Sequence, residues 1–215
     1  MPASPDHRLA AARFYAILDP GYAPPEKLAP LCRAVLAGGA DVVQLRAKAW
    51  PTSARVTLLR ALAPLCADAG VPLVCNDDLA AALAVPGVGL HVGQDDLPPR
   101  EARAALGPGR VLGLSTHSLP QARAALALGG VLSYFATGPV FATLTKPDYP
   151  AVGLDLVRAV AALNPALPWF CIGGINRANA ASVKAAGARA IVAVSEVLLA
   201  PAPAAVVREL RGGLR

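Results

Sequence analysis

Short apolar runs alternate with alanine- and leucine-rich stretches along nearly the whole chain. The runs are short enough to be strands, and the stretches between them have the three-to-four-residue spacing of helices. This alternation predicts parallel strands covered by helices on the outside. The predicted strands are 13–18, 41–46, 71–75, 88–92, 110–115, 131–136, 168–172 and 189–194; the predicted helices are 26–38, 53–69, 78–84, 98–106, 118–128, 153–163, 176–186 and 203–212.

Eight strand–helix units in 215 residues fit a closed (β/α)₈ barrel. The alternative is an open doubly wound sheet, in which ligand-binding residues gather at one switch point. Polar residues here follow nearly every apolar run, which favours the barrel. We therefore predict an α/β fold, with an N-terminal extension over 1–12 and a single TIM-barrel domain over 13–215.

The composition excludes several classes of protein. The net charge is +6, but the arginines are dispersed and only 5% of the residues are aromatic, so nucleic-acid binding is not predicted. No apolar stretch reaches the roughly 18–20 residues that a membrane-spanning helix needs. The N-terminus lacks a signal-peptide core, and the four scattered cysteines fit reduced thiols in a cytoplasmic protein. The oligomeric state stays open, a homo-oligomer included.

The second predicted strand carries three polar residues on one face. Gln44, Arg46 and Lys48 lie at i, i+2 and i+4, whereas Val43 and Leu45 lie on the opposite face. An edge strand with a polar outer face would explain this pattern, but a closed barrel has no edge. Because a buried cation is costly unless it is paired, we favour an inward-facing anion pocket.

Carboxylates follow the third and fourth strands, which are neighbours in a barrel. Asp77 and Asp96 could share one hard cation, because Mg²⁺ takes one or two carboxylates together with waters and phosphate oxygens. The alternative is that Asp77 or Asp78 caps the next helix. His91 alternates with apolar neighbours and is expected to face the barrel interior, where a packed core histidine is the alternative.

A second anion site is expected after the last three strands. Loops after strands seven and eight often bind phosphate in this architecture, through backbone N–H groups at a helix N-terminus. A simple tight turn is the alternative explanation for a glycine pair. The residues concerned are the pair Gly173-Gly174 and Ser195, with the hydroxyls of Thr143 and Thr145 in the loop 138–146; Lys146 of that loop belongs to the first anion site, with Arg46, Lys48 and Asn76.

Two anion sites and a metal site suggest a reaction between two phosphorylated small molecules. No Ser-His-Asp order, Cys–His pair, dinucleotide fingerprint or H-E-x-x-H motif stands out. A diphosphate leaving group stabilised by Mg²⁺ fits this set of residues.

Seven motifs in this order resemble the thiamine-phosphate synthase family. They are Gln44-Leu45-Arg46-Ala47-Lys48, Asn76-Asp77, His91-Val92-Gly93-Gln94-Asp95-Asp96, Gly113-Leu114-Ser115-Thr116-His117, Gly138-Pro139-Val140-Phe141, Thr143-Leu144-Thr145-Lys146 and Ile172-Gly173-Gly174-Ile175. The chain departs from the family pattern at Ala142, where proline is frequent, and in the continuation 146–150.

The resemblance implies an enzyme that joins a hydroxymethylpyrimidine diphosphate to a thiazole phosphate, releasing pyrophosphate. It assigns the Mg²⁺ ligands to Asp77 and Asp96, and the diphosphate contacts to Arg46, Lys48, Asn76, Ser115 and Lys146. Gln44 and His91 would lie beside the pyrimidine. The thiazole phosphate would be held by Thr143, Thr145, Gly174, Val194 and Ser195.

The related thiazole tautomerase, an isomerase on the same barrel, is the nearest alternative, with His117 for proton transfer. A non-catalytic regulator that binds a phosphate ligand is another. The tautomerase would not need the diphosphate and metal residues, and a regulator with disabled chemistry would be expected to lack some of them. The presence of Arg46, Lys48, Asp77, Asp96 and Lys146 therefore favours the synthase.

Overall fold

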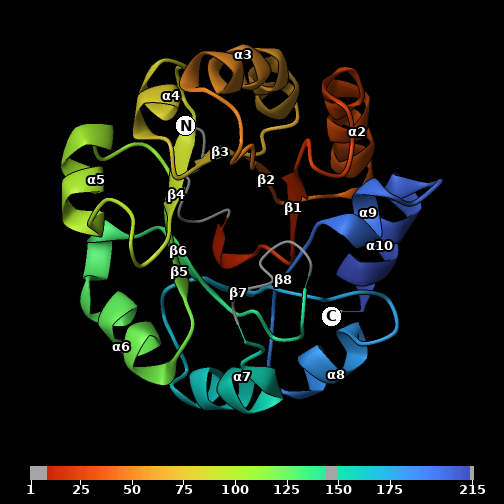
Figure 1. Cartoon of the computed structure of the whole chain (residues 1–215). Helices are drawn as coiled ribbons and strands as arrows, with labels where there is room; N and C mark the ends of the chain where they lie inside the picture. The colour runs from red at the N-terminus through yellow and green to blue at the C-terminus, as the bar shows by residue number, and fades with distance from the viewer. Residues whose placement is uncertain (1–8, 144–149, 214–215) are drawn as a thin grey trace.

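The computed structural model describes residues 9–143 and 150–213, in which eight parallel strands close into a barrel. Each strand pairs with the next along the chain, and β1 closes the barrel against β8 (Figure 1). The predicted (β/α)₈ fold is confirmed. The strands are β1 (Phe14–Leu18), β2 (Val42–Leu45), β3 (Leu73–Asn76), β4 (Gly89–Val92), β5 (Leu112–Thr116), β6 (Tyr134–Thr137), β7 (Trp169–Cys171) and β8 (Ile191–Ala193).

The helices form a ring around the barrel, as Figure 1 shows. Most of them lie within a few residues of the predicted ranges. The helices are α2 (Pro25–Gly38), α3 (Thr52–Asp68), α4 (Leu79–Leu83), α5 (Pro99–Leu106), α6 (Leu119–Ala127), α7 (Gly153–Ala162), α8 (Ala180–Ala185), α9 (Ser195–Leu198) and α10 (Pro203–Gly212), with a 3₁₀ turn, η1 (Gly129–Val131), after α6.

Two predicted boundaries near the C-terminus were wrong. The helix predicted from residue 176 begins at Ala180, because the Asn176 side chain accepts bonds from the N–H groups of Ala178 and Asn179 and forms a turn there. The strand predicted over 189–194 is shorter in the structure: β8 runs over Ile191–Ala193, and Ser195 opens the four-residue helix α9. This short helix was not predicted.

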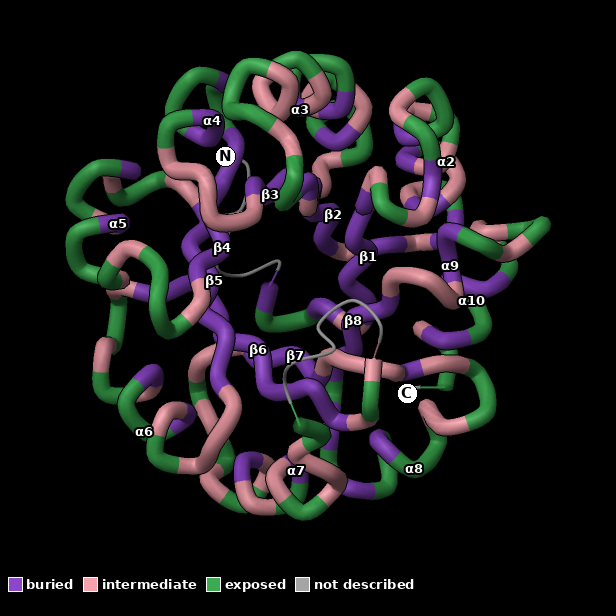
Figure 2. The backbone as a smooth tube through the Cα atoms, viewed as in Figure 1, coloured by how far each residue is buried: buried purple, intermediate pink, exposed green. Residues whose placement is uncertain are grey.

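The strands separate two hydrophobic clusters. Residues such as Phe14, Val43 and Leu45 face the helices and form the larger cluster, whereas Tyr15, Phe170 and their neighbours fill the barrel interior. The strands are buried on both faces, and the exposed positions lie mostly on the outer helices (Figure 2). The predicted direction of Val43 and Leu45, toward the helix layer, is confirmed.

The segment before β1 and the last helix, α10, are held to the rest of the barrel by polar and apolar contacts. Leu9 and Ala12, just before β1, belong to the interior cluster. Asp41 accepts bonds from the backbone N–H groups of Arg13 and Phe14 and pairs with Arg211 of α10 at 3.1 Å. Helix α10 packs on α2 and completes the helix ring. None of the helices among the described residues is both long and apolar enough to span a membrane.

Candidate active site

A cavity of about 400 Å³ opens at the carboxyl ends of the strands. The predicted site residues come to it from strands and loops that are far apart in sequence. Those that line it are Gln44, Arg46, Asn76, His91, Ser115, Thr143, Gly174, Val194 and Ser195. Lys48, Asp77 and Asp96 are not among the lining residues, and Thr145 and Lys146 lie outside the described part of the chain.

The Arg46 guanidinium is held by a carboxylate that the sequence reasoning missed. An Arg46 N–H donates to Asp19 Oδ2 at 2.6 Å, and the other carboxylate oxygen, Oδ1, accepts from the N–H of Gly21 at 2.8 Å. Asp19 is only 5% exposed. The cost of burying a cation was the signal that could have led to this partner, because Asp19 directly follows β1, the neighbour of β2.

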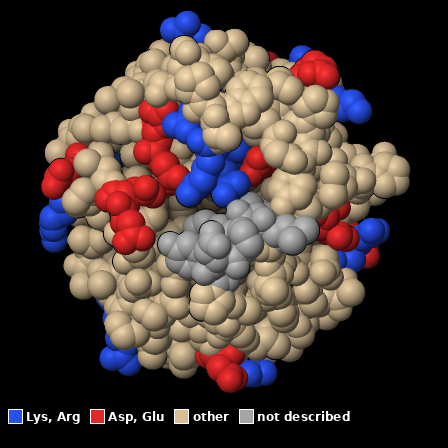
Figure 3. Space-filling view, in the orientation of Figure 1, with Lys and Arg blue, Asp and Glu red and all other residues tan. Residues whose placement is uncertain are grey.

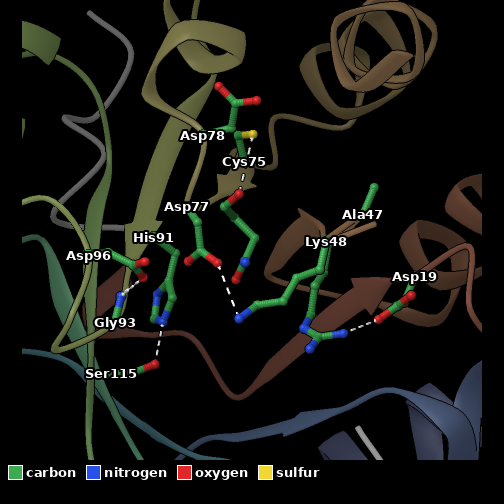
Figure 4. A network of polar contacts seen from close by, with 12 residues as sticks. Asp19, Ala47, Lys48, Cys75, Asp77, Asp78, His91, Gly93, Asp96 and Ser115 are labelled. Carbon is green, nitrogen blue, oxygen red and sulfur yellow. Dashed lines mark hydrogen bonds and ion pairs between the residues drawn. The ribbon is translucent and has the colours of Figure 1, made fainter. Parts of the chain in front are cut away.

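Lys48 and Asp77 face each other outside the cavity lining (Figure 4). Their Nζ and Oδ2 atoms are 3.6 Å apart, and the Lys48 side chain is 55% exposed. Asp77 has a left-handed backbone, with φ of 62°, and its N–H donates to the His91 carbonyl at 2.8 Å. The turn at the end of β3 thus holds this carboxylate beside β4.

The neighbouring Asp78 has the capping role. Its Oδ1 accepts from the Ala81 N–H at 2.9 Å, and its Oδ2 accepts from Thr52 and Arg55. Burial alone would raise the pKa of this carboxyl, but these hydrogen bonds outweigh burial and lower it. Since Asp78 caps α4, the helix does not require Asp77 as its cap.

Asp96 lies on the loop after β4, with Gly93 and His91 next to it in Figure 4. Its Oδ2 accepts from the Gly93 N–H at 2.7 Å. No group of three or more acidic, histidine or cysteine side chains that could hold a metal occurs within 9–143 and 150–213. The protein ligands of a cation here would be few, which suits Mg²⁺ whose other ligands are water and phosphate.

His91 belongs to a polar network inside the barrel. Its Nδ1 lies 2.8 Å from the Tyr134 hydroxyl, and its Nε2 lies 2.8 Å from Ser115 Oγ. The Gln44 amide donates to the Tyr15 hydroxyl at 2.8 Å, which in turn lies 2.8 Å from that of Tyr134. The predicted inward direction of Gln44 and His91 is confirmed. The two tyrosines were missed.

The glycine pair after β7 allows two loops to approach closely. Gly173 and Gly174 have positive φ of 101° and 63°. A Cβ on Gly173 would lie 2.4 Å from Pro139 Cα, and one on Gly174 would lie 2.6 Å from the Ala142 carbonyl oxygen. Only glycine fits both the backbone angle and the space. The pair therefore has a tight-turn role, and Gly174 also lines the cavity.

Other contacts hold these loops in place. The Arg177 Nε–H donates to Glu196 Oε1 at 2.6 Å, which ties the loop after β7 to α9. The ring nitrogen Nδ1 of His117 contacts the Gly138 carbonyl oxygen, joining β5 to the loop after β6. Ser195 lines the cavity from the first turn of α9.

Charged side chains of both signs gather near the centre of this face (Figure 3). The ion pairs around the barrel mouth are Arg46–Asp19, Lys48–Asp77 and Arg55–Asp78. The opposite wall of the cavity is built from Gly173, Gly174 and their neighbours and carries backbone groups, several small side chains and the Glu196 carboxylate, which pairs with Arg177. The site thus has one side rich in charged side chains and one side that offers many backbone groups.

Known proteins resemble this chain over nearly its full length. Residues 14–197 match the family model described as thiamine monophosphate synthase. A thiamine-phosphate synthase of Thermobifida fusca is 45% identical over 204 residues, covering 95% of this chain and 93% of the relative. One from Streptomyces avermitilis is 43% identical over 215 residues, covering 100% and 99%.

A solved structure agrees with these sequence matches. The thiamine phosphate pyrophosphorylase of Pyrococcus furiosus superimposes with a TM-score of 0.84 at 29% identity, covering 96% of each chain. The family match spans all eight strands of the barrel and the loops between them. The chain belongs to the thiamine monophosphate synthase family.

Proposed function

We propose that the protein condenses 4-amino-5-hydroxymethyl-2-methylpyrimidine diphosphate with 4-methyl-5-(2-phosphoethyl)thiazole to give thiamine phosphate and pyrophosphate. The observation that carries this proposal is that residues from both predicted anion sites line one and the same cavity. Family membership and the names of the relatives support the same transferase reaction.

The charged side of the cavity suits the diphosphate. Arg46 is held in one orientation by Asp19, so its guanidinium can meet phosphate oxygens with little further loss of side-chain freedom. Lys48 is exposed near it and can add a second positive charge. Asn76 of β3 and Ser115 of β5 line the cavity on either side of His91 and can donate hydrogen bonds. Lys146, in the same assigned set, lies outside the described residues.

The Mg²⁺ ligands are proposed to be Asp77 and Asp96. Both carboxylates flank His91 in Figure 4, and neither is used as a helix cap. Bound Mg²⁺ would stabilise the negative charge of the departing diphosphate as a Lewis acid. Asp77 also pairs with Lys48, so the loss of this carboxylate would disturb both the bound Mg²⁺ and the Lys48 ammonium.

The proposed reaction needs no protein nucleophile and no general base. The bond between the pyrimidine methylene carbon and the diphosphate oxygen breaks, and the diphosphate keeps the electron pair. The amino group of the pyrimidine stabilises the resulting cation. The thiazole nitrogen then gives its lone pair to that carbon, and no proton is lost. Gln44 and His91 would orient the pyrimidine from the cavity floor.

The backbone side of the cavity suits the thiazole phosphate. Thr143, Gly174, Val194 and Ser195 line it together, and Thr145 is proposed to join them from outside the described residues. Hydroxyls and N–H groups bind a phosphate dianion without adding another cation next to the reacting centre.

The partners of the protein are then small phosphorylated molecules rather than nucleic acid or a membrane. A cytoplasmic location is supported by the four buried cysteines, all of them free thiols. A homo-oligomer is compatible with the proposed reaction.

Pyrophosphate release tests the proposal. The full chain is mixed with the pyrimidine diphosphate, the thiazole phosphate and Mg²⁺, and pyrophosphate and thiamine phosphate are measured together. We expect both products in equal amounts, and neither when one substrate is omitted. Isomerisation of a thiazole carboxylate phosphate without pyrophosphate release would identify a tautomerase instead. Binding of either phosphate without any turnover would identify a regulator.

A further inference from the structure

Five side chains form a continuous hydrogen-bonded chain across the barrel interior, with both ends at the cavity. It runs from Gln44 through Tyr15, Tyr134 and His91 to Ser115, and each of its four links measures 2.8 Å. Gln44, Tyr15, His91 and Ser115 line the cavity, whereas Tyr134 is fully buried.

Gly113 of β5 leaves room for this network of side chains inside the barrel. A Cβ on Gly113 would lie 2.4 Å from the Tyr134 hydroxyl oxygen and 2.6 Å from His91 Nδ1. The backbone of β5 thus leaves open the space in which these two groups meet. A glycine at this strand position serves the network, since an interior glycine otherwise weakens a strand.

The Gln44 end of this network favours one order of its protons. The Gln44 amide donates to Tyr15, which leaves the Tyr15 hydroxyl proton for the bond to Tyr134. In this order Tyr134 gives its one proton to His91 Nδ1. Burial raises the pKa of both tyrosines, so neither hydroxyl loses its proton.

The order of donors continues through the histidine. A neutral imidazole whose Nδ1 accepts a hydrogen bond carries its proton on Nε2. That Nε2–H then donates to Ser115 Oγ. Among the described residues, His91 is the one hydrogen-bond partner of the Ser115 hydroxyl, so the proton of that hydroxyl remains available at the cavity.

We propose that Tyr15 and Tyr134 are positioning residues that fix the Nε2–H tautomer of His91 and thereby turn the Ser115 hydroxyl proton toward the substrate. The group that receives it is an acceptor atom, a ring nitrogen or a phosphate oxygen, of the pyrimidine diphosphate. The identity of the acceptor rests on the proposed function. The His91 tautomer is independent of that function, because the network is present in the protein without any substrate.

The tautomer can be read directly by nitrogen NMR. The chain has three histidines, so a ¹⁵N-labelled sample gives few ring signals, and their loss in His91→Asn assigns those of His91. Without substrates, we expect a protonated Nε2 and an unprotonated Nδ1. A proton on Nδ1 in the unmodified protein would overturn the proposal.

One substitution should reverse the direction of donation along the hydrogen-bond network. The carboxylate of Gln44→Glu can only accept, so Tyr15 must donate to it, Tyr134 must donate to Tyr15, and His91 must donate from Nδ1. We expect the His91 proton to move from Nε2 to Nδ1 in this variant. An unchanged Nε2–H signal in folded Gln44→Glu would contradict the ordering. The unmodified protein gives the answer on its own if the variant does not fold.

A double-mutant cycle tests the link to the substrate. Tyr134→Phe should lower kcat/KM for the pyrimidine diphosphate about tenfold, the effect of one hydrogen bond, and leave KM for the thiazole phosphate unchanged. In a Ser115→Ala background the same substitution should have little further effect, because Tyr134 acts through Ser115.

Thr137→Val is the matched control. Thr137 is a buried hydroxyl on the same strand as Tyr134, but it bonds to Thr116 and does not line the cavity. An equal loss from Tyr134→Phe in both backgrounds, or an equal loss in Thr137→Val, would contradict a positioning role. If the unmodified protein releases no pyrophosphate, the proposed function fails, and the NMR result still decides the tautomer.

Discussion

Asp19 and Arg46 show how a single buried pair can prepare a substrate contact. Asp19→Asn keeps the shape of the side chain and removes its charge. Arg46 then loses a charge-assisted partner and becomes freer to move. We expect kcat/KM for the pyrimidine diphosphate to fall roughly 10- to 100-fold, as for a charged hydrogen bond of about 1.5–3 kcal/mol, with a smaller change in KM for the thiazole phosphate.

The control for this prediction is Asp155→Asn. Asp155 also pairs with an arginine, Arg158 at 2.7 Å, but its side chain is 97% exposed on α7. Exposed pairs of this kind contribute little. An equal loss of activity in both variants, measured as steady-state pyrophosphate release, would show that Asp19 has no particular link to the site.

Asp77 and Asp96 are expected to set the Mg²⁺ requirement. Asp77→Asn and Asp96→Asn should each raise the Mg²⁺ concentration for half-maximal activity at least about tenfold, since a carboxylate is a stronger ligand for this cation than an amide. Asp95→Asn, next to Asp96 and exposed, should leave that concentration unchanged. A chelator should abolish turnover in the unmodified protein. Activity that persists in the chelator would refute the metal assignment.

At the residue scale, strand alternation predicted the inward direction of Gln44 and His91. It did not reveal Tyr15 or Tyr134, because a tyrosine within an apolar strand has the pattern of an ordinary core residue. Asp19 was missed for a different reason. Its role depends on the pairing of β1 with β2, which the local sequence does not contain.

At the scale of single elements, the start of α4 depends on a charged cap. Asp78→Ala removes the bond to Ala81 and leaves Arg55 without that partner. We expect the free energy of unfolding to fall by about 2 kcal/mol at neutral pH. The measurement is urea unfolding of the variant and of the unmodified protein.

The pH dependence of this loss has a defined sign. The folded pKa of Asp78 is lowered, so its stabilisation is fully present above the unfolded pKa of about 3.9 and is lost as pH falls through the folded pKa. The difference between the two proteins should therefore shrink in acid. Ser118→Ala removes the uncharged cap of α6, and its effect should not vary with pH. A difference for Asp78→Ala that stays constant in acid would disprove the charged-cap interpretation.

Element boundaries were predictable where glycine or a simple periodic pattern marks them, as at Gly39, which ends α2 in the left-handed conformation. They were not predictable around α8 and α9. Asn176 is a good helix-capping residue by type, but its side chain forms a turn instead. The four residues of α9 are too few to show helical periodicity.

At the scale of the whole molecule, the helix ring closes where α2 meets α10. A Cβ on Gly38 would lie 2.6 Å from Val207 Cβ and 2.8 Å from the Ala204 carbonyl oxygen. Gly38→Ala should therefore force α10 outward and lower the free energy of unfolding by roughly 1–3 kcal/mol, even though alanine favours helices. Thermal and urea unfolding measure this loss.

Gly109→Ala is the matched substitution in open space, with nothing within 4 Å of the added Cβ. Its effect should stay within about 0.5 kcal/mol. Similar stability of the two variants would show that α10 adjusts without cost and that the contact is not tight.

The closed barrel itself was predictable because every repeated unit has the same pattern and the polar residues recur at one end of each strand. Closure leaves no local signal of its own, since the pairing of β1 with β8 follows from the recurrence of polar residues after nearly every strand, which disfavours an open sheet. The size of the cavity was not predictable. It depends on how far Tyr15, Tyr134 and Phe170 fill the interior, which is a property of packing.

The separation of two apolar clusters by one layer of strands has a consequence for how such a protein can change over generations. Substitutions in the outer cluster, around Phe14, Val43 and Leu45, can alter expression and heat tolerance while the catalytic groups keep their positions. The tyrosines of the inner cluster also lie at the floor of the cavity, so substitutions in that cluster should change substrate selectivity before they change stability. Laboratory evolution for durability should therefore accumulate its accepted substitutions outside the strand layer.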